Sequence, residues 1–285
     1  MRVSLSIPWK EWFRYIDNLR NPLHLARSKV AVLATNSPAS LRPGQDHEPL
    51  RHSKCGLFSP NLAEYVTIDA IREPLPDQPR YSLEIQDGSG NPTTRIVIPP
   101  AEASRTFPAF VRTYQTPRND RQSWFSLNHA SSTSRRQKIA GRIPWLRHRF
   151  QNGDPDVTPV SPRHLENVIN QCIATKRAIR TTIYNQSLIL GARWTPKHRE
   201  VTQENCGNLP IRVTRYFGDQ TGLELLSSSP TTVWLWTGTC NCCSESRWAL
   251  EVGSGRDELA LAVHSGDTTR ELSWQNFLIG AISAV

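Results

Sequence analysis

Apolar and polar residues follow nearly the same pattern in two distant stretches of the chain. The first runs from Tyr81 to Val97 (YSLEIQDGSGNPTTRIV) and the second from Arg247 to His264 (RWALEVGSGRDELALAVH). In each, two apolar runs flank a segment rich in Gly, Asp or Asn, the composition that tight hairpin turns require. Both stretches are therefore predicted to form β-hairpins.

The similarity continues on both sides of the hairpins. An apolar run precedes each one, and a segment with regularly spaced aromatic residues follows it. The matching residues are all separated by the same 167 positions: Val66 and Val233, Leu83 and Leu250, Glu84 and Glu251, Phe107 and Trp274, and Phe110 and Phe277. A constant offset through strand, hairpin and helix indicates an internal duplication.

Apolar residues at helical spacing predict helices around the strands. One is expected at residues 8–20 and another at residues 101–115, directly after the first hairpin. A third should begin at Ser161, a residue type that caps helices, with Pro at the first helical position. A last helical stretch covers residues 271–282.

Shorter apolar runs predict the remaining strands. In the first half these are KVAVLAT and one or two strands between Gly56 and Ile71, and in the second half AIRTTIY, SLILGARW, PIRVTRYF, GLELLS and TVWLWTG. A loop carrying His198 is expected between SLILGARW and PIRVTRYF.

The whole pattern predicts an α+β fold of two similar repeats, each an antiparallel β-sheet with flanking helices. The repeats are expected at residues 1–115 and 161–285. Residues 116–160 are rich in Arg, Ser, Asn and Pro, contain one apolar island (IPWLRHRF), and are predicted to be a basic linker.

Composition and charge narrow the classes of partner. The chain has 285 residues and nine Trp, too many large apolar anchors for a disordered protein. Its formal net charge is +9, which favours anionic partners. Nucleic acid, a membrane surface and a carboxylate-bearing small ligand all fit this charge. No nucleotide-binding or nucleophile-elbow motif is present.

The six cysteines do not form the framework of a small disulfide-rich protein. Cys240, Cys242 and Cys243 are clustered, but no complementary pair lies nearby at the spacing of structural zinc sites, so reduced thiols are favoured over a metal site. The N-terminus lacks the features of a signal peptide, and no window of about 20 apolar residues could span a membrane. The predicted location is therefore cytoplasmic, without membrane insertion.

The order of strand, hairpin and aromatic-containing helix resembles the repeating domain of the haemin-degrading and haem-utilisation family, cytoplasmic haem carriers whose larger members are tandem duplications. YSLEIQDGSGNPTTRIVI with RTFPAFVRTY carries the resemblance in the first half, and RWALEVGSGRDELALAVH with LSWQNFLIGA in the second. HLENVINQCIATKRAIRTTIYN is similar to the helix-then-strand opening of a family half. The resemblance covers most of residues 25–114 and 160–281.

The resemblance also implies where haem would be held. In the family, a His on the strand after the opening helix holds the haem, with an Arg opposing it. The matching strand here is IRTTIY, which has no His, and neither has KVAVLAT, taken as its counterpart in the first half. Tyr184 as a phenolate, or His198 on the following loop, are then the candidate iron ligands.

Arginines near the same strand are candidates for the haem propionates, because a guanidinium suits a carboxylate geometrically. They are Arg177, Arg180 and Arg193. The resemblance thus implies binding of haem or a related porphyrin in a carrier or storage role in haem and iron utilisation. Haem degradation is less favoured because the axial His is missing. The alternative is a haem-less module of the same fold that binds an acidic partner or nucleic acid through the basic linker, as a monomer or a homodimer.

Overall fold

The computed structural model describes most of the chain outside the predicted linker and several loops. The described ranges are residues 1–28, 30–36, 57–60, 67–86, 92–116, 158–184, 188–206, 209–226, 231–239, 246–254, 259–266 and 271–283.

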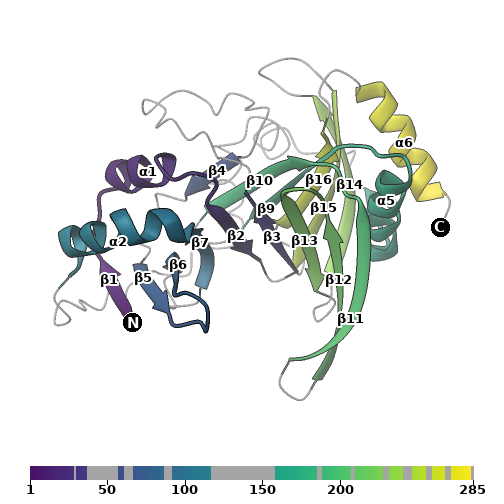
Figure 1. Cartoon of the computed structure of the whole chain (residues 1–285). Coiled ribbons are helices and arrows are strands. Elements are labelled where there is room, and N and C mark those ends of the chain that lie inside the picture. Colours follow the sequence, from purple (N-terminus) through teal and green to yellow (C-terminus); the bar gives the residue numbers. More distant parts are fainter. Residues whose placement is uncertain are drawn as a thin grey trace.

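In the first half, strands and helices follow one another in the order strand, helix, six strands, helix (Figure 1). The elements are β1 (Arg2–Leu5), α1 (Trp9–Asp17), β2 (Leu23–Arg27), β3 (Ala31–Thr35), β4 (Leu57–Pro60), β5 (Thr67–Glu73), β6 (Arg80–Gln86), β7 (Pro92–Ile98) and α2 (Pro100–Tyr114).

The second half repeats this order with extra strands. The elements are β8 (Thr158–Val160), α5 (Pro162–Ala174), β9 (Ile179–Tyr184), β10 (Leu188–Trp194), β11 (His198–Cys206), β12 (Leu209–Phe217), β13 (Thr221–Leu226), β14 (Thr231–Thr239), β15 (Ser246–Ser254), β16 (Leu259–Ser265) and α6 (Glu271–Ser283). As predicted, the hydroxyl of Ser161 caps α5, accepting a bond of 3.3 Å from the backbone N–H of Arg163.

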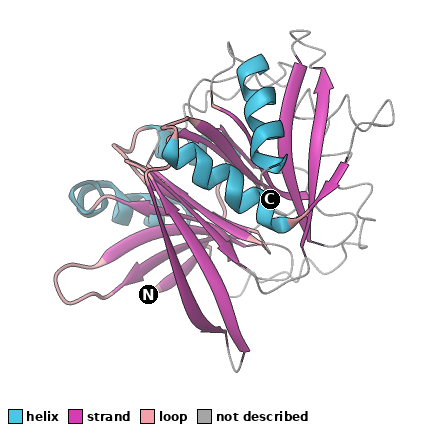
Figure 2. Cartoon of the chain, turned by 90° about the vertical axis from the view of Figure 1, so that its right-hand side faces the viewer, coloured by secondary structure: helices cyan, strands magenta, loops and turns pink. Residues whose placement is uncertain are grey.

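The strands form two antiparallel sheets. One has nine strands in the order β1-β5-β6-β7-β2-β3-β13-β12-β11, and the other has seven in the order β4-β10-β9-β16-β15-β14-β8. Figure 2 shows α5 and α6 beside each other, and both contact the seven-stranded sheet. The predicted α+β fold class, with antiparallel sheets and flanking helices, is confirmed.

The duplication is visible in the register of the strands. β7 spans residues 92–98 and β16 spans residues 259–265, the same offset of 167 that the sequence shows. Each repeat also has a register shift at corresponding points, after Ile85 and after Val252. Because an irregularity of this kind is a specific feature of a strand pair, its recurrence supports a common origin of the two repeats.

The two halves exchange strands between their sheets. β4 from the first half pairs with β10 in the seven-stranded sheet, and β13 from the second half pairs with β3 in the nine-stranded sheet. Each sheet therefore contains strands from both halves. The predicted repeat boundaries stay a prediction, although residues 158–160, at the end of the predicted linker, form β8.

Each sheet has one face covered by helices, which we call its helix face, and a reverse that we call its opposite face. In the first repeat, Tyr81 on β6 packs edge-on against Phe107 of α2, with ring centroids 5.2 Å apart. In the second, the indole N–H of Trp274 on α6 donates to the carbonyl of Trp248 on β15 (2.8 Å). The helix faces hold the core: Leu83 on β6 and its counterpart Leu250 on β15 are both fully buried.

Two strands differ from the sequence prediction. β2 directly follows α1, so the first-half counterpart of IRTTIY is LHLAR and not KVAVLAT, and this strand does carry a histidine, His24. It was missed because it is short and follows the helix-ending Pro22 at once. His198 begins β11 rather than lying in a loop. β11 was missed because it is an edge strand with polar residues on both faces, without apolar alternation.

Candidate functional site

Three basic side chains lie in one row across the seven-stranded sheet. Arg193 on β10 is directly opposite Arg180 on β9, and Arg180 is directly opposite His264 on β16. Residues directly opposite each other in antiparallel strands point to the same face. Thr181, the next residue of β9, lies on the helix face, where it is opposite Val263 on β16. Its hydroxyl accepts a 3.0 Å hydrogen bond from the indole N–H of Trp194. The basic row therefore lies on the opposite face.

Small residues form the surface beside this row. Gly191 on β10, Thr182 on β9 and Ala262 on β16 are aligned in the next row of the same face, and Ala249 on β15 is opposite His264. Thr182, Ala262 and Ala249 are all buried. We call these four residues the floor; the next residue in the row of Ala262 is Glu251 on β15. Small side chains let a neighbouring group pack close to the backbone of the sheet.

Arg193 is held in place by the end of β16. Its Nε donates to the carbonyl oxygen of Gly266, and Gly266 in turn donates its N–H to the carbonyl of Ala178 (3.1 Å). A Cβ on Gly266 would lie 2.7 Å from the carbonyl carbon of Ala178, so this close approach requires glycine. Among the described residues, the structure gives Arg193 no other side-chain hydrogen bond.

Arg177 lies apart from the row, against α6. Its guanidinium is 4.7 Å above the ring centroid of Phe277, and it donates to the hydroxyl of Ser273 (3.1 Å). These contacts tie the start of β9 to α6 on the helix side. The structure thus brings Arg180 and Arg193 together but uses Arg177 elsewhere.

The two candidate iron ligands lie on different sheets. His198 begins β11 of the nine-stranded sheet, and its exposed ring stacks on Phe217 with centroids 4.7 Å apart. Tyr184 ends β9 of the seven-stranded sheet, where its backbone pairs with Ile189. Its side chain is outside the described part of the structure. The ligand roles given to both residues stay predictions.

The sequence prediction missed His264. The alternation in LALAVHS is enough to place it on the same face as Ala262, but only the pairing of β16 with β9 puts it beside Arg180. His24 on β2 lies on the helix face of its sheet. It is directly opposite Ile96, which is directly opposite the helix-face residue Leu83. Burial lowers the pKa of His24 to about 4, so its imidazole is neutral at pH 7.

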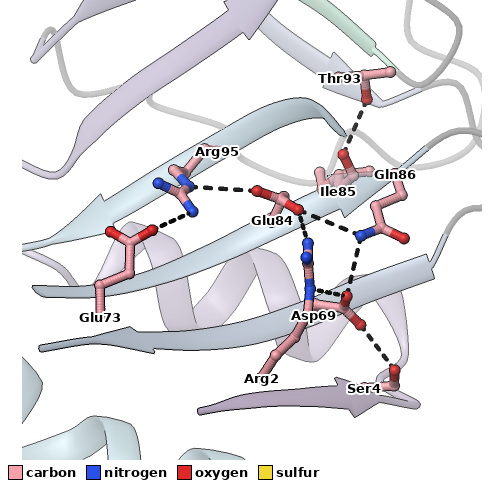
Figure 3. A network of polar contacts seen from close by, with 9 residues as sticks. All are labelled: Arg2, Ser4, Asp69, Glu73, Glu84, Ile85, Gln86, Thr93 and Arg95. Carbon is pink, nitrogen blue, oxygen red and sulfur yellow. Dashed lines mark hydrogen bonds and ion pairs between the residues drawn. The ribbon is translucent and has the colours of Figure 1, made fainter. Parts of the chain in front are cut away.

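The corresponding face of the first repeat is filled by charged side chains (Figure 3). Asp69, Glu84 and Arg95 are aligned in register on β5, β6 and β7. Arg2 bonds Asp69 at 2.7 Å and also pairs with Glu84, while Arg95 pairs with Glu84 at 3.4 Å and with Glu73 at 2.9 Å. Both central carboxylates, those of Asp69 and Glu84, are buried. We call this set the ion-pair network.

Several predictions fall outside the described residues. These are the linker residues 117–157 and the cysteines Cys240, Cys242 and Cys243. In the part of the chain that the structure describes, no group of three or more His, Cys, Asp or Glu residues could hold a metal ion. No helix within the described ranges is long and apolar enough to cross a membrane.

No protein-family model matches the chain, and no curated protein matches its sequence. Solved structures do share its fold. The haem-degrading enzyme ChuS of Escherichia coli O157:H7 is similar with a TM-score of 0.73 and 12% identity, over 98% of this chain and 86% of ChuS. PhuS, a haem-binding protein from Pseudomonas aeruginosa, is similar in its haem-bound form with a TM-score of 0.67 and 12% identity, over 97% of this chain and 86% of PhuS. The predicted resemblance to haem-utilisation proteins is confirmed at the level of the fold.

Proposed function

We propose that the chain binds haem, or a related porphyrin, on the opposite face of the seven-stranded sheet. The observation that carries this proposal is the row of Arg193, Arg180 and His264 beside a floor of small residues. The fold shared with a haem-binding and a haem-degrading protein supports the choice of ligand. The role that fits is a cytoplasmic carrier or store in haem and iron utilisation.

The donor set on this face suits the two ends of haem. The guanidinium groups of Arg180 and Arg193 match the two propionates, because each can donate two parallel hydrogen bonds to a carboxylate. The small side chains of Gly191, Thr182 and Ala262 leave a flat surface on which an apolar ring can lie. When bound, haem supplies a redox-active iron, while the chain supplies the charges and the surface that orient it.

A carrier or storage role is favoured over haem breakdown. β9 carries no histidine at the place where the family holds its axial ligand, and ligand identity and its hydrogen bonds tune the reactivity of iron. A chain that binds the propionates and the ring, without that ligand on β9, is suited first to holding haem. Turnover of haem by an added reductant is the observation that would favour an enzyme instead.

The test is a titration with haemin and with haemin dimethyl ester, in which both carboxylates are blocked. A charge-assisted hydrogen bond is worth about 1.5–3 kcal/mol, or roughly tenfold to hundredfold in affinity. The double variant Arg180→Gln/Arg193→Gln should therefore bind haemin at least about tenfold more weakly, and should no longer distinguish haemin from its ester. Arg105→Gln, which removes an exposed arginine from α2, is the matched control.

Two results would contradict the proposal. One is a double variant that binds haemin as tightly as the natural chain. The other is unsaturable binding that disappears at high salt, because this would mean only that a basic surface attracts an anionic porphyrin. The second result would favour the haem-less alternative, in which the basic linker binds an acidic partner or nucleic acid. That alternative rests on the composition of residues 116–160. Sedimentation with and without haemin would decide between a monomer and a homodimer.

A further inference from the structure

We propose that His264 supplies the axial ligand to the iron of the bound haem. This inference rests on the proposed function and adds to it the residue that would hold the metal. It replaces the candidates Tyr184 and His198, which the sequence alone suggested.

Among the described residues, His264 is the only histidine on the opposite face of the seven-stranded sheet. The structure describes three others. His24 is buried on the helix face of the other sheet. His164 lies on α5, with its Nδ1 3.1 Å from the carbonyl oxygen of Ser161. His198 stacks on an aromatic ring in the nine-stranded sheet. Of the histidines that the structure describes, His264 is therefore the candidate for an iron ligand on the proposed face.

The position of His264 along the row fits this role. Arg180 is one strand away and Arg193 is two strands away on the same side, which is about 10 Å at the usual strand spacing. On the other side of His264 the next residue is Ala249. The cationic groups thus lie on one side of the imidazole, and Ala249, followed by Trp236 on β14, lies on the other. A porphyrin whose propionates reach the arginines extends over His264 toward Ala249.

The chemistry of the side chain supports a ligand role. A neutral imidazole nitrogen is among the commonest protein ligands for iron and is the proximal ligand of many haem proteins. His264 is half-buried and therefore partly shielded from water. The competing role is that of a third cation for the propionates, since His264 stands in the same row as the arginines. The two roles differ in whether they require the metal.

Metal-free protoporphyrin separates these roles. It carries the same two propionates as haemin but has no iron. If His264 ligates iron, His264→Gly should weaken haemin binding by at least about tenfold and leave protoporphyrin binding unchanged. The iron–imidazole stretching band in the resonance Raman spectrum of the ferrous complex should disappear. Added free imidazole should restore it, because the missing side chain leaves room for the same group. His164→Ala is the control for loss of an exposed histidine from α5.

Three outcomes would overturn the inference. An unchanged iron–imidazole band in His264→Gly would show that another histidine ligates the iron, and His198→Ala would then test that residue. A change in the spectrum of the bound haem in Tyr184→Phe, but not in His264→Gly, would show that the phenolate of Tyr184 ligates the iron. An equal loss of haemin and protoporphyrin affinity in His264→Gly would make it a propionate partner. In all three the natural chain still binds haemin. If the natural chain binds neither porphyrin, the proposed function itself has failed.

Discussion

The opposite faces of the two repeats differ at equivalent positions. In the first repeat the row of Asp69, Glu84 and Arg95 is joined by ion pairs and closed by Arg2 (Figure 3). In the second repeat, the residue 167 positions after Arg95 is Ala262, which lies between Thr182 on β9 and Glu251 on β15. The first face pairs its charged side chains with one another, whereas the second has Ala262 in place of Arg95 and Thr182 in place of Leu25.

The difference indicates that the two repeats of a duplicated fold can serve different roles, one in stability and one in ligand binding. Buried carboxylates require partners, so a network such as that of Asp69 and Glu84 fixes its face in one arrangement. A face of small residues gains little from its own contacts and has the most to gain from a ligand. We therefore expect changes in the first repeat to alter stability, and changes on the second repeat's face to alter ligand affinity.

The largest expected effect is a loss of folding stability at low pH, which comes from His24 on the helix face of the first repeat. His24 of the first repeat occupies the position of Thr181 in the second, and burial lowers its pKa to about 4. The unfolded chain takes up this proton near the ordinary histidine pKa, while the folded chain does not until about pH 4. Stability is therefore fully present above about pH 6.5 and falls as the pH drops toward 4. The loss should reach about 3 kcal/mol.

Urea unfolding between pH 7.5 and 4, compared with His24→Gln, measures this effect. The variant lacks the titrating group, so the part of the acid loss that belongs to His24 should vanish. Parallel curves for the two proteins over this range would show that His24 is accessible to protons in the fold.

A smaller effect is expected from breaking the ion-pair network. Glu84→Gln removes the carboxylate that Arg2 and Arg95 share, leaving Arg2 paired with Asp69 and Arg95 paired with Glu73. Because Arg2 is half-exposed, solvent screening reduces the cost, and we expect a loss of about 2 kcal/mol in unfolding free energy. Haemin affinity should not change, since the network lies in the first repeat. A variant that keeps its stability and loses haemin would reverse the assignment of the two faces.

The smallest expected effect is on the chemical reactivity of the Cys172 thiol. Burial raises the pKa of the Cys172 thiol on α5 to about 12. Hardly any thiolate is present near neutral pH, so Cys172 should resist alkylation in the folded chain. Iodoacetamide labelling at pH 8 followed by peptide mass spectrometry measures this. Labelling of Cys172 without denaturant would show that the second repeat opens locally.

Local patterns predicted much of the fold. The two hairpins, the capped start of α5 at Ser161 and the fold class all follow from composition and spacing within short windows. The exchange of β4 and β13 between the sheets does not, because which strands pair across the halves depends on packing that no window contains. β11 was missed for a related reason, since an edge strand does not need an apolar face.

The candidate site shows the same limit. Arg180 and Arg193 were predicted from their nearness to one strand, and the structure brings them into register. Arg177 was grouped with them on the same grounds, yet its side chain is directed to Phe277 and Ser273. His264 was missed because it lies 84 positions after Arg180 in the sequence and meets it only through pairing of β16 with β9. The positions of the arginines in the sequence indicated the strands that carry them, but only the register of the paired strands showed which side chains lie together.

The most direct test of the central claim gives the second repeat the residues of the first. Leu25 and Ala34 of the first repeat correspond to Thr182 and Gly191, as the pairing of each with its neighbours shows. Thr182→Leu/Gly191→Ala therefore fills the floor with side chains that the same fold already tolerates. Steric overlap of this kind costs about 1–3 kcal/mol, so haemin should bind about tenfold to hundredfold more weakly, and an unfolding curve checks that the double variant is still folded. A double variant that is folded and binds haemin as tightly as the natural chain would show that haem does not lie on this face.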